Sequence, residues 1–188
     1  MKTLFLTLFL TFISVQGFAQ TSISFEIQAY PAGLITGLRF DYSLNDQVQL
    51  ILRGAYNATN RRDWGVQDNE EGGGLGFGIG AEIQNSSIKE LSMNVRADLW
   101  FMDIDYYNIE TICPFVAPCL DQRIDGRSDV IVLQPTVGFS YQIPVSSSFF
   151  LKPTINLGYE INIKTEGEDV GEGAILLGGI QIGHLFKN

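Results

Sequence analysis

Apolar and polar residues alternate along most of this chain. The longest regular stretch covers residues 149–164, FFLKPTINLGYEINIK, where the positions from Leu151 to Ile163 that share one parity are apolar or aromatic. Successive side chains of a strand point to opposite faces, so this segment has one apolar face and one polar face. A strand in a globular protein averages about 5 to 6 residues, whereas a tilted strand that crosses a bilayer needs about 9 to 11. The length favours a strand that crosses a membrane.

The same alternation predicts eight strands, at residues 22–29, 34–43, 47–57, 74–83, 91–102, 130–143, 149–164 and 174–186. Three polar segments, 58–73, 103–129 and 165–173, are predicted to be long loops, the first because it is too hydrophilic to be buried. Short and long connections alternate when turns lie on one side of a membrane and loops on the other. The connection at residues 30–33 is short where a long one is expected. We therefore predict an all-β fold, an eight-stranded antiparallel up-and-down barrel.

The charges on the polar faces decide which face points outward. Strands of this kind can also form a soluble lipocalin-like carrier with its apolar residues inside. The polar faces carry five basic and five acidic residues, namely Arg39, Arg53, Arg96, Lys152 and Lys164 with Glu26, Asp41, Glu82, Asp98 and Glu160. A narrow interior needs such a balance, because an unpaired charge in a confined space of low dielectric constant is costly. We expect a transmembrane barrel with its apolar face toward lipid and its charges inside.

Aromatic residues fall near both ends of the predicted strands. On the apolar face, four lie near the short-turn ends (Tyr42, Tyr141, Phe149 and Phe186) and two near the long-loop ends (Tyr56 and Phe101). Membrane barrels place aromatic girdles at the two interfaces of the bilayer. A soluble carrier gives no reason for this placement.

The N-terminus has the pattern of a secretory signal peptide. Lys2 is followed by an apolar run from Leu4 to Val15, and small residues, Gly17 and Ala19, occupy the −3 and −1 positions of the predicted cleavage site. We predict that residues 1–19 are removed and that residues 20–188 form a single domain. Elsewhere the sequence has no run approaching the ~18 apolar residues of a spanning helix, so any membrane insertion must use strands.

These features together resemble the small eight-stranded outer-membrane barrels, the OmpX-like and OmpA-transmembrane-type group. The resemblance covers nearly all of the mature chain and rests on the signal peptide, the strand pattern, the girdles and Phe186 near the C-terminus. It implies a place in the outer membrane, in contact with its lipid and lipopolysaccharide. It also implies recognition of the C-terminal strand by the outer-membrane assembly machinery through an aromatic residue. Here Lys187 and Asn188 follow that residue, which departs from the family's pattern.

The only two cysteines, Cys113 and Cys119, lie in the predicted loop 103–129. Export to an oxidising compartment favours a disulfide between them over two free thiols, and they lack the His or Cys partners of a zinc site. Apolar residues surround them: Ile112, Pro114, Phe115, Val116, Ala117, Pro118 and Leu120. We expect such a patch to cap the barrel mouth or to meet a partner.

Two features suggest chemistry, and neither is assigned as a site. Gly74, Gly76, Gly78 and Gly80 superficially match a dinucleotide-binding loop, but they have a period of two inside a strand, and that motif must join a strand to a helix. We expect them to leave room for large interior neighbours such as Arg96, Trp100 or Arg53.

His184 is the only histidine, so a lipid-modifying enzyme with a general base of the Ser-His-acid kind must use it. It has the parity of Ile180 and Ile182 and is predicted to face lipid near the short-turn rim. No Ser or acid can be placed beside it, which favours an interfacial histidine over a catalytic one. We predict no enzyme activity, no catalytic residue, no cofactor and no metal ligand.

The function favoured by the sequence is a non-enzymatic outer-membrane barrel that presents acidic loops for structural, adhesive or partner-binding roles. The alternative is a narrow channel or carrier for small solutes, although the interior of eight strands is just wide enough for its own side chains. We expect a monomer that does not bind nucleic acid.

The negative charge is concentrated in the three predicted loops. We expect Glu166, Glu168, Asp169 and Glu172 to lie near the mouth together with Asp121, Asp125 and Asp129. Carboxylate oxygens bind divalent cations readily, so these residues are predicted to recruit such cations and bridge to anionic lipopolysaccharide or to a basic partner.

Overall fold

The computed structural model describes residues 21–62, 64–113 and 119–186. These residues form nine strands: β1 (Thr21–Tyr30), β2 (Gly33–Ser43), β3 (Val48–Arg62), β4 (Asp68–Gln84), β5 (Leu91–Ile112), β6 (Leu120–Tyr141), β7 (Ile143–Pro144), β8 (Phe149–Glu166) and β9 (Gly173–Phe186). Across those ranges, a helix of the length and apolarity needed to cross a membrane is not found. The predicted signal peptide, residues 1–19, lies outside the described residues.

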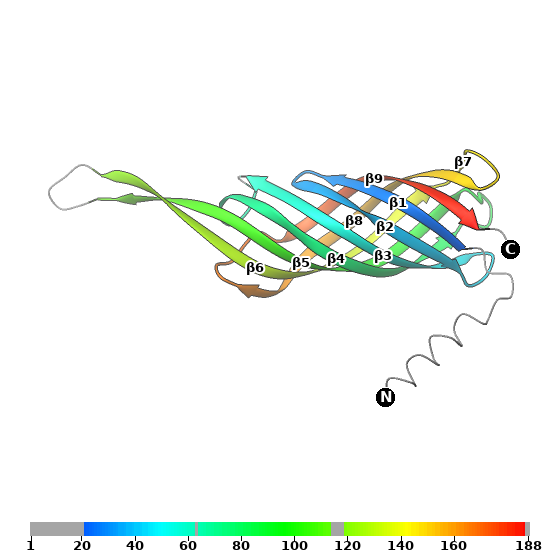
Figure 1. The fold of residues 1–188 in the computed structure, drawn as a ribbon, viewed down its shortest axis with the longest axis horizontal. Helices are drawn as coiled ribbons and strands as arrows, with labels where there is room; N and C mark the ends of the chain where they lie inside the picture. The colour runs from blue at the N-terminus through cyan, green and yellow to red at the C-terminus, as the bar shows by residue number, and fades with distance from the viewer. Residues whose placement is uncertain (1–20, 63, 114–118, 187–188) are drawn as a thin grey trace, which may run out of the picture.

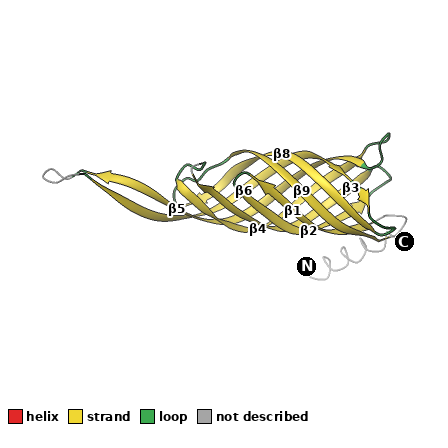
Figure 2. Cartoon of the chain, turned by 90° about the horizontal axis from the view of Figure 1, so that it is seen from above, coloured by secondary structure: helices red, strands yellow, loops and turns green. Residues whose placement is uncertain are grey.

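The eight long strands close into a ring. Each long strand pairs antiparallel with its neighbours in the order β6-β5-β4-β3-β2-β1-β9-β8, and β6 also pairs with β8. The two-residue β7 adds to β8 beside the turn that precedes it. Figures 1 and 2 show the strands tilted around a common axis. The predicted eight-stranded up-and-down barrel is therefore confirmed.

Side chains alternate across the wall of this barrel along most of each strand. Large apolar residues such as Leu38, Phe77 and Leu157 are exposed on the outside, while charged residues such as Arg39 and Glu82 are buried inside. Period-two strands in a closed sheet give this separation directly, because each residue must face either the lumen or the surroundings. The predicted apolar exterior and charged interior are both confirmed.

The polar segment 58–73 is mostly strand, so its prediction as a loop was wrong. β3 continues to Arg62 and β4 begins at Asp68, which leaves a short connection between them. Its most hydrophilic part is also not all exposed, because Arg61 and Glu70 are buried at the barrel mouth. Hydrophilic residues enter strands here because the two strands supply each other's backbone hydrogen bonds and the lumen supplies partners for the charges.

The predicted loop 103–129 was also wrong, because most of it is a two-stranded ribbon. β5 and β6 remain paired from Asp103↔Asp129 to Ile112↔Leu120 and project beyond the barrel by roughly 30 Å. Figure 1 shows this ribbon extending past the ends of all other strands. The predicted disulfide Cys113–Cys119 closes its tip. Most of the apolar residues expected around the cysteines, 114–118, lie outside the described residues.

Lys164 points outward, and its predicted place in the lumen was wrong. β6 pairs Ile131 with Lys164 but Val132 with Asn162, so β8 holds one extra residue at this point. An inserted residue of this kind, a β-bulge, reverses the faces of the side chains that follow it. Lys164 instead pairs with Glu166 at the surface.

An apolar layer lies inside the lumen toward the ribbon end, which the sequence did not predict. Its members are Ile35, Ala55, Trp100, Met102, Ile104, Val130, Val132, Val170, Ile175 and Leu177. On β9 the consecutive apolar residues 175–177 are explained by this layer, since Ile175 and Leu177 face inward and Leu176 faces outward. Val170 reaches the layer from the β8–β9 loop and covers it at the mouth.

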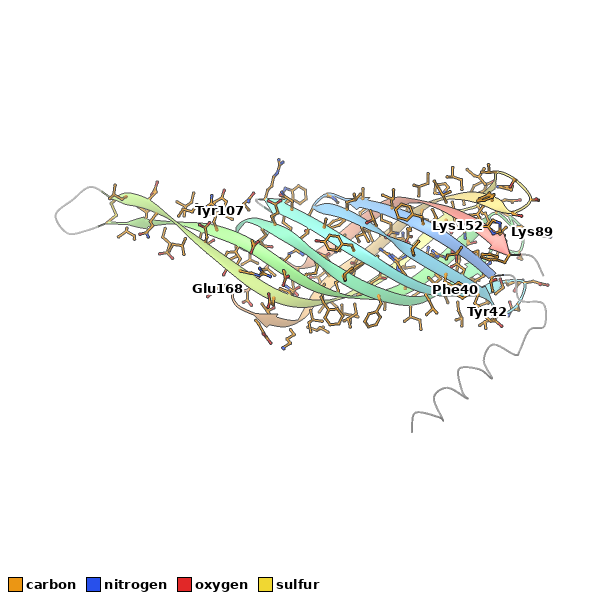
Figure 3. All side chains as sticks on the ribbon, viewed as in Figure 1. Phe40, Tyr42, Lys89, Tyr107, Lys152 and Glu168 are labelled. Carbon is orange, nitrogen blue, oxygen red and sulfur yellow. A yellow bond between two sulfur atoms is a disulfide. The ribbon has the colours of Figure 1, made fainter. Side chains whose placement is uncertain are left out.

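Aromatic side chains are exposed near both ends of the barrel wall. Tyr141, Phe149 and Phe186 lie toward the short turns, and Tyr56 and Phe101 lie toward the ribbon end. Figure 3 places Tyr42 and Lys89 at the end where the described chain begins and stops, with Tyr107 and Glu168 toward the other end. This arrangement agrees with the two predicted girdles.

Candidate functional site

The lumen holds three groups of buried ion pairs. Among the described residues, five cations and six carboxylates are buried inside: Arg39, Arg53, Arg61, Arg96 and Lys152 with Glu26, Asp41, Glu70, Glu82, Asp98 and Glu160. The predicted five-to-five balance thus loses Lys164 and gains Arg61 and Glu70. Both were missed because they lie beyond the predicted ends of their strands.

The first group, the Lys152 cluster, lies toward the short-turn end. Glu82 of β4 accepts from Lys152 Nζ at 2.8 Å and from Arg39 Nη2 at 2.6 Å, using one oxygen for each. Arg39 Nε also donates to Asp41 at 2.7 Å, and Ser22 donates to the second oxygen of that carboxylate. Strands β1, β2, β4 and β8 are joined across the lumen by this cluster.

The second group, the Arg96 cluster, occupies the middle of the barrel. Arg96 Nε lies 2.8 Å from Asp98, and its Nη1 lies 3.6 Å from Glu26. Arg53 contacts the same two carboxylates at 3.6 and 3.3 Å. The side-chain oxygen of Gln28 accepts a hydrogen bond from each guanidinium group, so it links these two like charges. Arg53 also stacks over the Trp100 ring at 5.4 Å, where the ions meet the apolar layer.

The third group, the Arg61 cluster, lies at the mouth. Arg61 donates through Nη1 to Glu70 and through Nη2 to Glu160, each at 3.0 Å. Glu70 also accepts from the backbone N–H groups of Val66, Gln67 and Gly171. It therefore ties the β3–β4 connection to the β8–β9 loop. Sequence reasoning could not find this link, because the partners are about 100 residues apart and lie in segments predicted as loops.

The glycines of β4 make room for these interior groups, as predicted. A Cβ at Gly76 would overlap the Trp100 ring, and one at Gly80 would crowd Arg96. At Gly78 the conflict would be with the Asp98 carboxylate. The glycine period of two follows from packing inside the lumen, with no role for a phosphate-binding loop.

The ribbon has one mostly polar face, which also carries the exposed Ile109, and one face on which three large apolar side chains lie among polar ones. Cross-strand partners share a face, so Thr111 with Asp121 and Tyr107 with Asp125 lie on the polar side. Those groups satisfy one another: Thr111 donates to Asp121 at 2.7 Å, and Arg123 stacks on Tyr107 at 4.1 Å. Near the ribbon base, a hydrogen bond to Asp103 raises the pKa of Arg127.

Three large apolar side chains on the opposite face of the ribbon are exposed. These are the cross-strand pair Ile112 and Leu120, and Ile124, which has the same parity as Leu120. The adjoining edge of β6 is also open, since β6 first pairs with β8 at Asp129↔Glu166. In the described part of the chain, residues 120–128 thus have a pairing strand on one side alone.

His184 lies between two aromatic rings at the short-turn rim. Its ring centroid is 4.9 Å from that of Phe149 and 4.8 Å from that of Phe186. In the wall its neighbours are Ile23 on β1 and Phe149 on β8, so neither adjacent strand places a Ser or an acid directly opposite it. This geometry fits an interfacial histidine, as the sequence suggested.

The acidic residues that were expected together at the mouth are far apart, because some of them lie along the ribbon. Asp129 pairs with Glu166 at the top of the wall, but Asp125 and Asp121 lie four and eight residues farther along β6, at roughly 13 and 26 Å. The expectation that all of them gather at the mouth was wrong. Within the described ranges, three or more His, Cys, Asp or Glu side chains do not come together as metal ligands would. Cation binding by the remaining loop acids stays a prediction.

Comparison with known proteins gives similarity in structure alone. Neither a protein-family model nor a curated protein sequence matches the chain. Among solved structures, the N-terminal β-barrel domain of Pseudomonas aeruginosa OprF is 18% identical with a TM-score of 0.47, and the match covers 89% of this chain and 97% of that one.

Two further solved structures are similar over almost the same span. Neisserial surface protein A is 14% identical with a TM-score of 0.43, covering 90% of this chain and 96% of that chain. Ail, the attachment invasion locus protein of Yersinia pestis, is 13% identical with a TM-score of 0.45, covering 89% and 97%.

Proposed function

We propose that the chain is a non-enzymatic outer-membrane barrel, closed to solutes, that displays the β5–β6 ribbon outside the cell. The observation that carries this proposal is the sidedness of the wall, apolar outside and charged inside. Within lipid every backbone polar group must be satisfied by the protein itself, and a closed barrel achieves this. An apolar surface around a whole barrel would be an aggregation hazard in water, whereas it suits a bilayer.

The two ends of the barrel differ, and this difference supports one orientation in the membrane. The connections at 44–47, 85–90 and 142–148 lie together with both ends of the described chain, and the ribbon, the longest connection, lies at the opposite end (Figure 1). Outer-membrane barrels keep short turns in the periplasm and long connections outside. We place the ribbon outside, the C-terminal strand with Phe186 where the assembly machinery reads it, and lipid with lipopolysaccharide around a monomeric wall.

The apolar layer favours a closed barrel over the narrow channel or carrier. Trp100 and Met102 of β5 lie inside the lumen beside their cross-strand partners on β6, Val132 and Val130, and Val170 packs on this cluster from the β8–β9 loop. Trp100 Nε1 also donates to Gln134 at 2.6 Å, which fixes the ring in place. Solutes and water would have to displace a packed core to pass.

The ribbon is the part of this barrel best suited to contact a partner protein. It carries exposed Ile112, Leu120 and Ile124 on one face, and it offers an open edge on β6. An extended peptide can add to such an edge through main-chain hydrogen bonds, while pockets or apolar side chains give specificity. Most polar groups of the other face pair with one another, so we assign contact to the face that carries the three large apolar side chains.

Fractionation with surface proteolysis tests this function. We expect the intact chain in the outer-membrane fraction after carbonate washing, with external protease cutting the ribbon and leaving a protected barrel. A variant in which Asn-Gly replaces residues 108–124 should fractionate identically and lose surface cleavage. Recovery in the soluble periplasmic fraction, or a ribbon cut in spheroplasts and protected in whole cells, would contradict the proposal.

A further inference from the structure

The β1–β2 hairpin is shorter than its neighbours and leaves a notch in the barrel wall. β1 first pairs with β9 at Ala29↔Gly178, so residues 173–177 of β9 have β8 on one side and, among the described residues, no strand on the other. Across the gap, β2 ends at Gly33↔Thr59 while β3 continues to Arg62. In Figure 1 the blue hairpin ends short of the cyan end of β3.

A cavity of about 220 Å³ lies in this notch. It is lined by the hairpin turn at 30–32, by Arg61, Trp64 and Glu160, and by residues 171–176. Ile175 is 6% exposed and faces the lumen, whereas Leu176 is 49% exposed and faces outward. Ile175 and Leu176 are neighbours in sequence, their side chains point to opposite sides of the wall, and both line the cavity. The cavity therefore surrounds the unpaired edge of β9. It is therefore reachable from outside the wall.

The cavity contains an incompletely paired carboxylate. Glu160 is 5% exposed; its Oε2 accepts from Arg61 at 3.0 Å, and its Oε1 has no hydrogen-bond partner. Arg61 is shared, since its other terminal nitrogen is bound to Glu70. Glu70 itself is saturated by backbone N–H groups, and Glu172 adds another negative charge to the lining. The lining thus holds more negative charge than Arg61 neutralises.

Aromatic rings border the same space. Trp64 lines the cavity with 78% of its surface exposed, and Tyr30 contributes its ring from the hairpin end. An aromatic face attracts a cation through its quadrupole, and a carboxylate gives a cation a charge-assisted hydrogen bond. The cavity thus combines an exposed ring, Trp64, with a buried carboxylate oxygen, Glu160 Oε1, that no protein group donates to. This combination suits a positively charged ligand.

We propose that the notch binds a small organic cation, an ammonium group that carries a short apolar substituent. The ammonium would donate to Glu160 Oε1 and the apolar part would lie against Trp64 and Leu176. The volume is below the roughly 300 to 1,000 Å³ of sites for drug-sized ligands, so the ligand is small. A free amine and a lipid ethanolamine headgroup both offer this chemistry. The proposal goes beyond the display function and does not depend on the ribbon.

Titration of the purified full chain in a zwitterion-free, non-ionic detergent with phenethylammonium tests the site. We expect saturable binding with a change in Trp64 fluorescence, and the signal should disappear in Trp64→Phe while binding measured by calorimetry persists. The neutral 2-phenylethanol and the anionic 3-phenylpropionate should bind at least about tenfold more weakly, since each lacks the charged hydrogen bond. Equal affinity for the neutral analogue would overturn the proposal.

Two variants locate the binding. Glu160→Gln should weaken phenethylammonium binding about tenfold or more, whereas Glu110→Gln removes the same charge from the distant ribbon and should leave it unchanged. Ala174→Phe fills the open side of the cavity from an exposed position and should also abolish binding, which provides a second test if Glu160→Gln fails to fold. Wild-type affinity in Ala174→Phe, or an equal loss in Glu110→Gln, would show that the notch is not the site.

Nanodiscs separate the two sources of the cation. Discs of phosphatidylglycerol alone should bind the amine as detergent does. If adding phosphatidylethanolamine competes with the amine, the ligand is a lipid headgroup; if it does not, the ligand is soluble. Absence of binding in both discs and detergent would overturn the inference and leave the proposed display function untouched.

Discussion

Lys152 on β8 donates through Nζ to Glu82 Oε1 on β4 at 2.8 Å, although β5 and β6 separate these two strands in the wall. The ion pair therefore crosses the lumen instead of following the sheet. Figure 3 shows Lys152 within the barrel outline near the short-turn end. Together with Arg61, which links β3 to Glu160 on β8, it braces opposite sides of the barrel.

A lumen filled in this way should not conduct ions. We predict that the purified protein in planar bilayers shows no steady ohmic conductance at any voltage the bilayer tolerates, with gramicidin added afterwards to confirm that currents can be detected. The reason is that the three groups of ion pairs, together with the apolar layer, leave no continuous aqueous path. Reproducible open-channel steps from the wild-type protein would contradict this.

Removing the charge of Arg96 should lower the stability of the barrel strongly, because Arg96 is buried among carboxylates in the lumen. Arg96→Met leaves Glu26 and Asp98 to share Arg53, so we expect the free energy of unfolding in detergent to fall by about 3 to 5 kcal/mol. The double variant Arg96→Met/Asp98→Asn should lose less than the sum of the two single changes, because it removes a cation together with its partner.

Arg127→Met is the matched control for Arg96, since Arg127 pairs with Asp103 at the exposed ribbon base. It should leave the unfolding transition where the wild type has it. An Arg96→Met variant as stable as this control would show that the lumen is hydrated and that its ion pairs are not confined.

Glu70 should control the order of the mouth. In Glu70→Ala the N–H groups of Val66, Gln67 and Gly171 lose their acceptor, so their hydrogen exchange should accelerate at least about tenfold. Glu71→Ala, one residue away on the exposed face of β4, should leave those amides protected. Unchanged protection in Glu70→Ala would mean that the β8–β9 loop is held by its other contacts, such as Ser128 to the backbone of Glu168.

The disulfide should stabilise the ribbon and not the barrel. Cys113→Ser/Cys119→Ser should lower the free energy of opening the ribbon by about 2 to 3 kcal/mol, as expected for a short closed loop. Protease should therefore cut the ribbon faster. The barrel melting temperature should stay the same, because the tip is far from the lumen. A large fall in barrel stability would show that the ribbon tip packs on the mouth.

The barrel could be predicted from the sequence because lumen and exterior impose a period of two on every strand. Nine of the eleven interior charges, the glycine stripe of β4 and the disulfide were recovered from that pattern or from the two cysteines. The same reasoning failed for the loops 58–73 and 103–129. For residues 58–73 it took hydrophilic composition to exclude strands, although a paired strand outside a membrane can be polar on both faces.

The other incorrect or missing predictions have physical causes that a single sequence does not reveal. Lys164 was placed inside because a β-bulge in β8 changes parity without any mark in the local composition. The Arg61 cluster depends on contacts between residues about 100 positions apart. The apolar layer was missed because the sequence placed Trp100 inside as a single large residue, while Ile175 and Leu177 lie in an apolar run that does not alternate.

The measurement that tests the central claim most directly is the effect of a charge on the outer wall. Ile79→Arg places a guanidinium near the middle of β4 on the exposed apolar face. If that face lies in lipid, the free energy of folding into phospholipid vesicles should become less favourable by about 2 to 4 kcal/mol. Ile109→Arg, on the exposed ribbon, should have no effect. A folded, lipid-free Ile79→Arg protein that is more soluble than the wild type and equally stable would contradict a membrane-embedded wall.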